Sequence, residues 1–163
     1  HGTIGGSLAH ADPAADWGAL VLAADAAIIT QSSDTSRRIA ATEFFQGLFT
    51  TALEDGEIIT EIRVPVPAEG TKTNYQKFSQ PASRFAIVGC AVMKKPDGKT
   101  NIAFTGVSEA PFRDAAAEAA ASADAAVAAA AEGITIMGDH FASEEYRKHL
   151  AKVYLKKALQ AVA

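Results

Sequence analysis

The sequence predicts an α+β protein, because segments with the pattern of antiparallel strands and segments with the pattern of helices lie in separate runs along the chain. Residues 85–95 and 100–107 have the composition of two apolar strands, and the turn Pro96-Asp97-Gly98-Lys99 between them predicts a β-hairpin. The alanine-rich residues 114–132 predict a helix that ends at Gly133.

The N-terminal elements are expected to be short. Asp12 and Pro13 predict the N-cap and the first turn of a helix over residues 14–22. Residues 26–30 form a short β-rich run, and residues 36–40 are expected to pair with it across a polar turn.

The middle of the chain predicts a strand, a linker and a further strand. Residues 42–47 indicate a short helical or irregular segment. Residues 57–64 alternate in polarity like a half-buried strand, which Pro65 stops. Residues 65–73 contain prolines, a glycine and polar side chains, so they predict a linker, and residues 74–78 predict the next strand.

The C-terminal segment predicts an amphipathic helix. Ser143 supplies an N-cap and two glutamates follow it in the first turn, where the helix dipole favours negative charge. Apolar side chains then recur at helical spacing to the C-terminus, at Tyr146, Leu150, Val153, Tyr154 and Ala158.

Charge and cysteine content exclude several function classes. The chain carries 15 Lys and Arg against 19 Asp and Glu, a formal net charge of −4, whereas a nucleic-acid binder needs a clustered basic surface. The single cysteine, Cys90, excludes an internal disulfide framework and a zinc or iron–sulfur site built from several cysteines. Cys90 lies in the middle of a predicted strand, where a buried apolar role is usual. We see no signal peptide and no apolar run long enough to span a bilayer, so the expected location is the cytoplasm.

The glycine pair near the start of the chain is the first candidate site. Gly5, Gly6 and Ser7 offer either an anion-binding nest for a phosphate or a plain turn. They fit neither the dinucleotide-binding fingerprint nor the P-loop. Asp12 and Asp16 follow at a spacing of four residues, and one of them is placed to bind a ribose or another hydroxyl, although helix capping is the better interpretation for Asp12.

No other segment carries a catalytic pattern. The four histidines lack the spacing of metal ligands, so we expect no metal site, and no serine has the context of a nucleophile. Lys77 and Arg84 flank an irregular segment that is either a ligand-facing loop or a strand edge. The residues alone assign no catalytic group and favour a binding module over a self-sufficient catalyst.

The chain starts at a glycine-rich segment with no element in front of it and no initiator methionine. Because paired glycines usually follow a strand, we expect the sequence to be a fragment of a longer protein.

Taken together, five stretches of the sequence resemble one family in order. It is the FAD-binding medium subunit of aerobic carbon monoxide dehydrogenases, within the xanthine dehydrogenase family of molybdenum hydroxylases. The resemblance covers essentially the whole chain, and the stretches that carry it are residues 2–16, 44–53, 56–65, 75–88 and 142–150.

The resemblance implies two structural units. Residues 1–66 would be the C-terminal part of the FAD-binding domain, a partial lobe with a mixed or antiparallel sheet and helices. Residues 72–163 would be the C-terminal medium-subunit domain, a small α+β unit with a three-stranded antiparallel sheet and helices. The first lobe of the family, with its own Ala-Gly-Gly-x-Ser-Leu phosphate loop, has no counterpart in the sequence, so we expect this chain alone to bind FAD weakly or not at all.

The resemblance also implies a set of cofactor contacts. The pyrophosphate and the flavin would be contacted, chiefly through backbone groups, by Thr3, Ile4, Gly5, Gly6 and Ser7. Asp16 would form a hydrogen bond with the cofactor, and Ile59 would lie beside the isoalloxazine or the adenine end. In related enzymes a lysine on the strand after the linker reaches the flavin. The aligned position here is Ser79, and Lys77 is the nearest lysine.

In the family that it resembles, the medium subunit relays electrons and does not oxidise the substrate. A large molybdopterin subunit oxidises the substrate, a small subunit with two 2Fe–2S clusters passes the electrons on, and FAD delivers them to an external acceptor. The implied assembly is a dimer of such heterotrimers. Two alternatives remain open: a flavin-free scaffold or subunit-interaction module of such a complex, and a stand-alone flavin oxidoreductase. The sequence identifies neither the substrate of the complex nor its electron acceptor.

Overall fold

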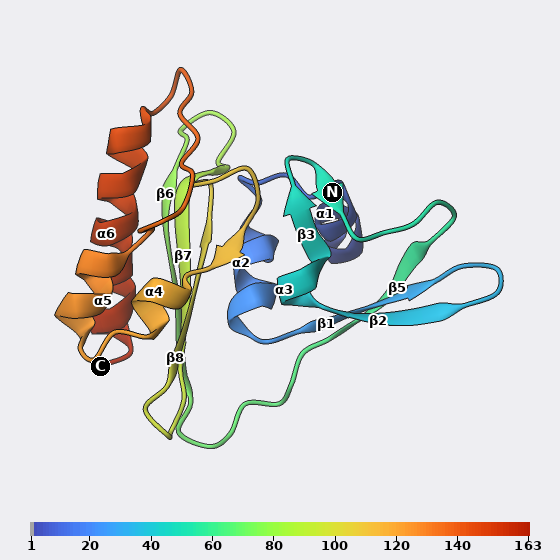
Figure 1. The fold of residues 1–163 in the computed structure, drawn as a ribbon, viewed down its shortest axis with the longest axis horizontal. Helices are drawn as coiled ribbons and strands as arrows, with labels where there is room; N and C mark the ends of the chain where they lie inside the picture. The colour runs from blue at the N-terminus through green and yellow to red at the C-terminus, as the bar shows by residue number, and fades with distance from the viewer. Residues whose placement is uncertain (1) are drawn as a thin grey trace.

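In a computed structural model, which describes residues 2–163, the chain forms an α+β fold, as predicted. A four-stranded sheet lies between two layers of helix, and a smaller three-stranded sheet extends to one side (Figure 1). Helix α6 (Glu144–Ala161) covers one face of the larger sheet, and α2 (Asp16–Ala23) covers the other. No helix within residues 2–163 is both long enough and apolar enough to cross a membrane.

The N-terminal part of the chain builds the smaller sheet and the segments around it. The strands of this sheet are antiparallel in the order β2-β1-β5, and Ala27 lies opposite Ala40, so the predicted pairing of two short strands is confirmed. The elements other than α2 are α1 (Ile4–His10), β1 (Ala27–Gln31), β2 (Ser36–Ala40), α3 (Ala41–Phe44), β3 (Phe45–Gly47), β4 (Thr50–Thr51) and β5 (Ile58–Arg63).

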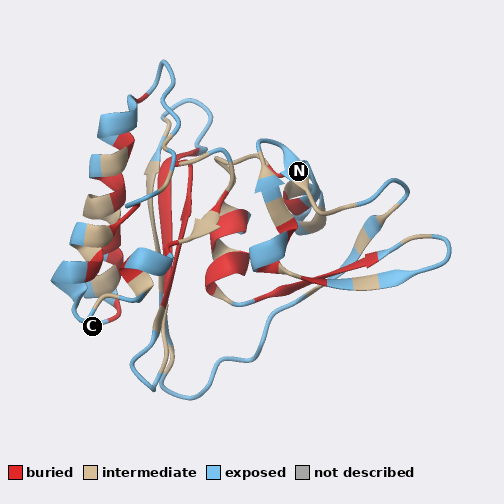
Figure 2. Ribbon diagram, viewed as in Figure 1, coloured by how far each residue is buried: buried red, intermediate tan, exposed pale blue. Residues whose placement is uncertain are grey.

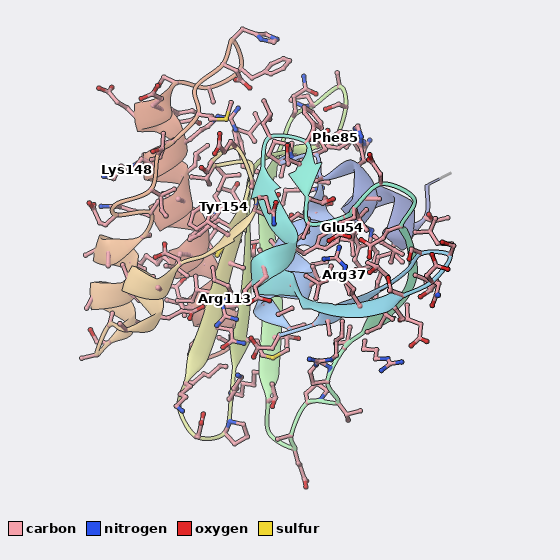
Figure 3. The ribbon with its side chains drawn as sticks, turned by 45° about the vertical axis from the view of Figure 1, so that its right-hand side comes forward. Arg37, Glu54, Phe85, Arg113, Lys148 and Tyr154 are labelled. Atoms are coloured by element: carbon pink, nitrogen blue, oxygen red, sulfur yellow. The ribbon has the colours of Figure 1, made fainter. Side chains whose placement is uncertain are left out.

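An ion-pair cluster ties the smaller sheet to the loop before β5. The Arg37 guanidinium donates to the Glu57 carboxylate (Nε to Oε1 2.7 Å) and lies 3.1 Å from the Glu54 carboxylate, as Figure 3 shows for Arg37 and Glu54. The Thr30 hydroxyl donates to the same Glu57 oxygen at 3.0 Å. The Glu57 side chain is only 2% exposed, so these donors replace the water that its carboxylate would otherwise bind.

The C-terminal part builds the larger sheet and three helices. The strands run in the order β6-β7-β8-β9, and the predicted hairpin is confirmed as β7 and β8, with Lys94 opposite Thr100. The bounds are β6 (Lys72–Ser79), β7 (Ala86–Lys94), β8 (Thr100–Thr105), β9 (Phe112–Arg113), α4 (Ala115–Glu118) and α5 (Ala123–Ala129). The C-terminal helix is confirmed as well: the Ser143 hydroxyl accepts from the Tyr146 N–H at the start of α6.

The larger sheet has four strands, so the expectation of three was wrong. The additional strand, β9, contains two residues, which is too short for a periodic pattern in the sequence. Its place is decided by a side chain, because the Arg113 guanidinium donates to Glu118 (Nη2 to Oε2 2.9 Å) and to Asp25 (2.6 Å).

Strand β7 is buried on both faces, which explains its continuous apolar sequence. Val88, Cys90 and Val92 belong to the core under α6, whereas Ala91 belongs to the core under α2. Figure 2 shows buried segments on the sheet and on the helices that face it. On the α2 side the two central strands present Ala91 and Ala103, whose small side chains leave room for the helix.

The prediction of one continuous helix over residues 114–132 was wrong, since α4 and α5 are separate short helices. The Asp114 carboxylate, which is buried, accepts from the Ala117 N–H at 3.0 Å and from the Ala131 N–H at 2.7 Å. In a continuous helix Asp114 and Ala131 would be about 25 Å apart at 1.5 Å per residue. The buried carboxylate outweighs the helix propensity of alanine, and the Ser122 hydroxyl caps the restarted helix at the Ala125 N–H.

The role predicted for Asp12 also needs correction. Helix α2 starts at Asp16 with Ala15 at the N-cap position, four residues later than Asp12. The Asp12 carboxylate accepts from the Ala14 N–H at 2.9 Å and so stabilises the turn between α1 and α2.

We predict that the Arg37–Glu57 pair contributes to acid sensitivity. The hydrogen bonds from Arg37, with that from the Glu54 N–H, lower the pKa of the Glu57 carboxyl from 4.5 to about 2. This contribution is fully present above pH 4.5 and is lost as the pH falls towards 2. In urea unfolding measured over this interval, the free energy of unfolding should fall less steeply for Glu57→Gln than for the wild type. The exposed Glu43→Gln variant on α3 should keep the wild-type slope, and an unchanged slope for Glu57→Gln would contradict the prediction.

Candidate functional site

The glycine segment near the N-terminus forms the first turn of helix α1, so the alternative of a plain turn was wrong. The Thr3 side chain acts as the N-cap and accepts from the Gly6 N–H at 3.0 Å. Leu8, one turn further along the helix, is 1% exposed and anchors α1 in the core. The signal for this helix was a threonine three residues before a glycine, followed by an apolar anchor.

The first turn of α1 leaves its backbone open to solvent. The N–H groups of Ile4 and Gly5 have no carbonyl to bond within the helix. A Cβ added to Gly5 would have no heavy atom within 4 Å, so another molecule can approach this backbone closely. The resemblance assigns five consecutive residues to one site, and the structure places them in a single turn. They are Thr3, Ile4, Gly5, Gly6 and Ser7. Free N–H groups at a helix N-terminus are suited to a phosphate.

The structure also brings Asp16 and Lys77 together, although they are 61 residues apart in sequence. Asp16 is the first residue of α2, and its Oδ2 accepts from the Lys77 Nζ on β6 at 2.7 Å. The Lys77 ammonium also donates to the Arg84 carbonyl at 3.0 Å. The Asp16 side chain is 37% exposed and that of Lys77 is 22% exposed, so a ligand can reach both.

Tyr75 is a member of this cluster that the sequence analysis missed. Its hydroxyl donates to Asp16 Oδ1 at 2.6 Å. The spacing of two residues on β6 puts Tyr75 and Lys77 on the same face of the strand, and this periodicity was the available signal. Burial and the hydrogen bond to Asp16 raise the pKa of the Tyr75 phenol, so it remains a donor at neutral pH.

An apolar groove of about 250 Å³ adjoins the start of α1. Ile4, Trp17, Leu20, Val64 and Met93 are among the residues that line it. The Trp17 side chain is 44% exposed, so its ring is accessible to another molecule. The groove offers apolar contact to a flat ring system beside the open backbone of α1.

Ile59 lies on β5, the strand that packs next to α1. It is partly buried against the core that contains Leu8 and Phe44. Ile59 makes apolar packing contacts in this structure. It does not belong to the polar cluster around Asp16, and it is a separate candidate for apolar contact with a ligand.

The turn between α1 and α2 is held in place by the larger sheet. The Thr105 hydroxyl, at the end of β8, donates to the Pro13 carbonyl at 2.5 Å and lies 2.8 Å from the Ala15 carbonyl. The Gly106 N–H donates to the Pro13 carbonyl as well, and the Ala86 N–H donates to the Ala14 carbonyl. These bonds fix the start of α2, and with it Asp16, over the end of the sheet.

Cys90 lies elsewhere and has no part in the cluster. It is buried at 0% exposure, as its position in the middle of a strand predicted, and burial raises the pKa of its thiol. Within residues 2–163 no group of three or more His, Cys, Asp or Glu side chains is arranged to hold a metal ion.

Comparisons with known proteins identify the family of this chain. Residues 1–67 match the family described as the FAD binding domain in molybdopterin dehydrogenase, and residues 73–162 match the CO dehydrogenase flavoprotein C-terminal domain. The chain belongs to the CO dehydrogenase flavoprotein family. The resemblance stated from the sequence is thereby confirmed.

Individual members of the family match nearly all of the chain. The glyceraldehyde dehydrogenase medium chain of Sulfolobus acidocaldarius is 36% identical over 99% of this chain and 62% of its own length. The carbon monoxide dehydrogenase medium chain of Hydrogenophaga pseudoflava is 33% identical over 98% of this chain and 60% of its own length. The chain therefore spans about 60% of the length of these relatives.

Solved structures of the family have the same fold. Carbon monoxide dehydrogenase from Hydrogenophaga pseudoflava, in a form that lacks the Mo-pyranopterin moiety of the molybdenum cofactor, superposes with a TM-score of 0.92 at 34% identity over 99% of this chain and 60% of that one. Quinoline 2-oxidoreductase from Pseudomonas putida 86 superposes with a TM-score of 0.88 at 29% identity, with the same coverage.

We predict that Thr105→Val loosens the turn that carries Asp16. Valine has nearly the same shape but removes one donor from the partly buried Pro13 and Ala15 carbonyls, so the free energy of unfolding should fall by about 1 kcal/mol. Urea unfolding measures this loss. The exposed Thr73→Val variant on β6 is the control and should unfold like the wild type. Equal stability of the two variants would contradict the role given to the Thr105 hydroxyl.

Proposed function

We propose that this chain is the FAD-carrying medium subunit of a molybdenum hydroxylase. The observation that carries the proposal is the convergence of three features around the α1–α2 turn. These are the open first turn of α1, the apolar groove beside Ile4 and Trp17, and the Asp16–Lys77 pair. They match the three kinds of surface on FAD, namely its pyrophosphate, its aromatic rings and its polar edges.

Each part of the site has a role in holding FAD. The N–H groups of Ile4 and Gly5, which have no carbonyl partner within the helix, would bind the pyrophosphate, because the helix dipole favours negative charge there. Thr3, Gly6 and Ser7 would line the same turn, and Thr3 holds its shape through the hydrogen bond from the Gly6 N–H. Gly5 would let the phosphate come close to the backbone. Asp16 offers acceptors and Lys77 a donor to the polar edge of the cofactor, and Ile59 would give apolar contact from β5.

FAD supplies the redox chemistry, since it accepts electrons in pairs or singly. The protein then contributes binding, orientation and electrostatics. The Asp16–Lys77 pair places one negative and one positive charge side by side at the site, and both remain partly exposed to a ligand. Such a site suits electron transfer, which needs a cofactor held in a fixed position.

The proposal extends to the electron route and the partners. Relatives of this chain carry names such as "medium chain" and "complex subunit", which supports a multi-subunit assembly. We propose that a large molybdopterin subunit oxidises the substrate and that a small subunit with 2Fe–2S clusters passes the electrons to FAD, in a dimer of heterotrimers. Cys90, the one cysteine in this sequence, is buried and offers no set of ligands for such a cluster. Residues 1–66 and 72–163 are proposed as the two domains of this subunit.

We predict that Gly5→Ala weakens FAD binding without weakening the fold. A methyl group on Gly5 has free space in the chain itself but would obstruct a phosphate at the first turn of α1. Alanine also favours a helix over glycine by about 0.5–1 kcal/mol, so the free energy of unfolding should not fall. The experiment uses the full-length protein as its host produces it. FAD is removed from this protein and titrated back, and binding is followed by flavin fluorescence.

The expected result is at least a tenfold rise in the dissociation constant, about 1.4 kcal/mol, for Gly5→Ala. Gly47→Ala on β3, where a methyl group also has room, is the matched control and should bind FAD like the wild type. A wild-type protein without a visible flavin band, even after incubation with FAD, would refute the proposed function.

The partners are tested by isolating the native complex through a tag on this chain. We expect a larger chain with molybdenum and a smaller chain with iron and sulfide, identified by mass spectrometry and metal analysis. Flavin-loaded protein without partners would instead support a stand-alone oxidoreductase. Partners without flavin would support a scaffold.

A further inference from the structure

We infer that Tyr75 is a positioning residue that holds the Asp16 carboxylate in a fixed orientation for the cofactor. The inference rests on the proposed function, because it concerns the same site. It adds a residue that makes no direct contact with the ligand and acts through Asp16.

Two separate donors hold the two carboxylate oxygens of Asp16. The Tyr75 hydroxyl donates to Oδ1 at 2.6 Å, and the Lys77 ammonium donates to Oδ2 at 2.7 Å. One donor on each oxygen prevents the carboxylate from rotating about its bond to Cβ. Both donors stand on β6, so the sheet imposes the orientation of a side chain that belongs to α2.

Gly89 gives the Tyr75 side chain its path to Asp16. A Cβ on Gly89 would lie 2.3 Å from the Tyr75 hydroxyl oxygen and 2.7 Å from Cγ2 of Thr105. Gly89 is on β7, opposite Lys77 on one side and Thr105 on the other. A glycine in the middle of a strand weakens it and often marks a close approach of other groups, and here the approaching group is the phenol.

The remaining hydrogen-bonding capacity of the cluster points to a ligand. The Lys77 ammonium has three N–H groups and uses two, one for Asp16 and one for the Arg84 carbonyl. Each Asp16 oxygen keeps a free lone pair after accepting one bond. A fixed acceptor and a fixed donor thus remain side by side, which is the arrangement that gains most from preorganisation.

The test is a double-mutant cycle on FAD binding with Tyr75→Phe, Asp16→Ala and the double variant, in the protein as its host makes it. Tyr75→Phe removes one oxygen atom and keeps the ring. We expect it to raise the dissociation constant of FAD about fivefold, or about 1 kcal/mol. Because Tyr75 acts through Asp16, the double variant should bind FAD no more weakly than Asp16→Ala alone. Tyr154→Phe is the matched control. Tyr154 belongs to α6, its ring packs against Phe78 on β6, and it forms no hydrogen bond with Asp16.

The midpoint potential separates positioning from stability, and unfolding in urea tests the Tyr75–Asp16 bond itself. The midpoint potential of bound FAD should change in Tyr75→Phe and should show the same non-additivity with Asp16→Ala, which a general loss of stability would not produce. The same cycle in urea, without FAD, should show coupling between Tyr75 and Asp16.

The outcomes distinguish the inference from the proposed function. If Asp16→Ala weakens FAD binding and Tyr75→Phe does not, the positioning role is overturned and the proposed function stands. If the effect of Tyr75→Phe is as large in the Asp16→Ala background as in the wild type, Tyr75 does not act through Asp16 and the inference fails. If the wild type binds no FAD, the proposed function and the cofactor role of Tyr75 fail together, whatever the urea cycle shows.

Discussion

The rest of the structure depends on how three consecutive carbonyls, those of Pro13, Ala14 and Ala15, are satisfied. These carbonyls are partly shielded from water, so a missing donor would cost free energy, and the donors come from the ends of β7 and β8. Gly106 can serve as one of them because its φ is +77°, and a Cβ there would lie 2.6 Å from the Ile87 carbonyl oxygen. Because these hydrogen bonds hold the turn against the sheet, they also fix the positions of α1 before it and α2 after it. The open turn at Thr3 and the carboxylate of Asp16 are therefore placed by a sheet to which neither belongs.

Close packing by small residues reinforces the same arrangement. Gly18 on α2 accommodates the Pro111 ring, which would lie 2.5 Å from a Cβ at that position. Ala91 on β7 and Ala103 on β8 belong to the core that α2 shares with α1 and α3, so one apolar core spans both matched family domains. The Asp16–Lys77–Tyr75 cluster sits at this junction. The proposed cofactor site is consequently a property of the packing between the two parts of the chain.

Local patterns predicted the elements whose shape is decided within a few residues. The hairpin of β7 and β8 follows from a strong turn between two apolar runs, and α6 follows from Ser143 with its acidic first turn. Where prediction failed, a distant group intervened. Asp114 binds the Ala131 N–H and breaks the alanine-rich helix, and Arg113 holds a strand too short to have a pattern. The glycine segment is a different case, because its helix is stabilised locally by the Thr3 cap and by the buried Leu8.

The sequence by itself determined the family and the α+β class, and it named most of the residues that we propose to contact FAD. These depend on residue types and their order, which the sequence records directly. Only the tertiary structure decided that Asp16 and Lys77 form a pair, that Tyr75 joins them, and that the glycine turn lies beside an apolar groove. Such contacts join segments about sixty residues apart, and their geometry depends on which side chains leave room, as Gly89 does for the Tyr75 phenol. Packing complementarity of this kind has no local periodicity, so no reading of neighbouring residues reveals it.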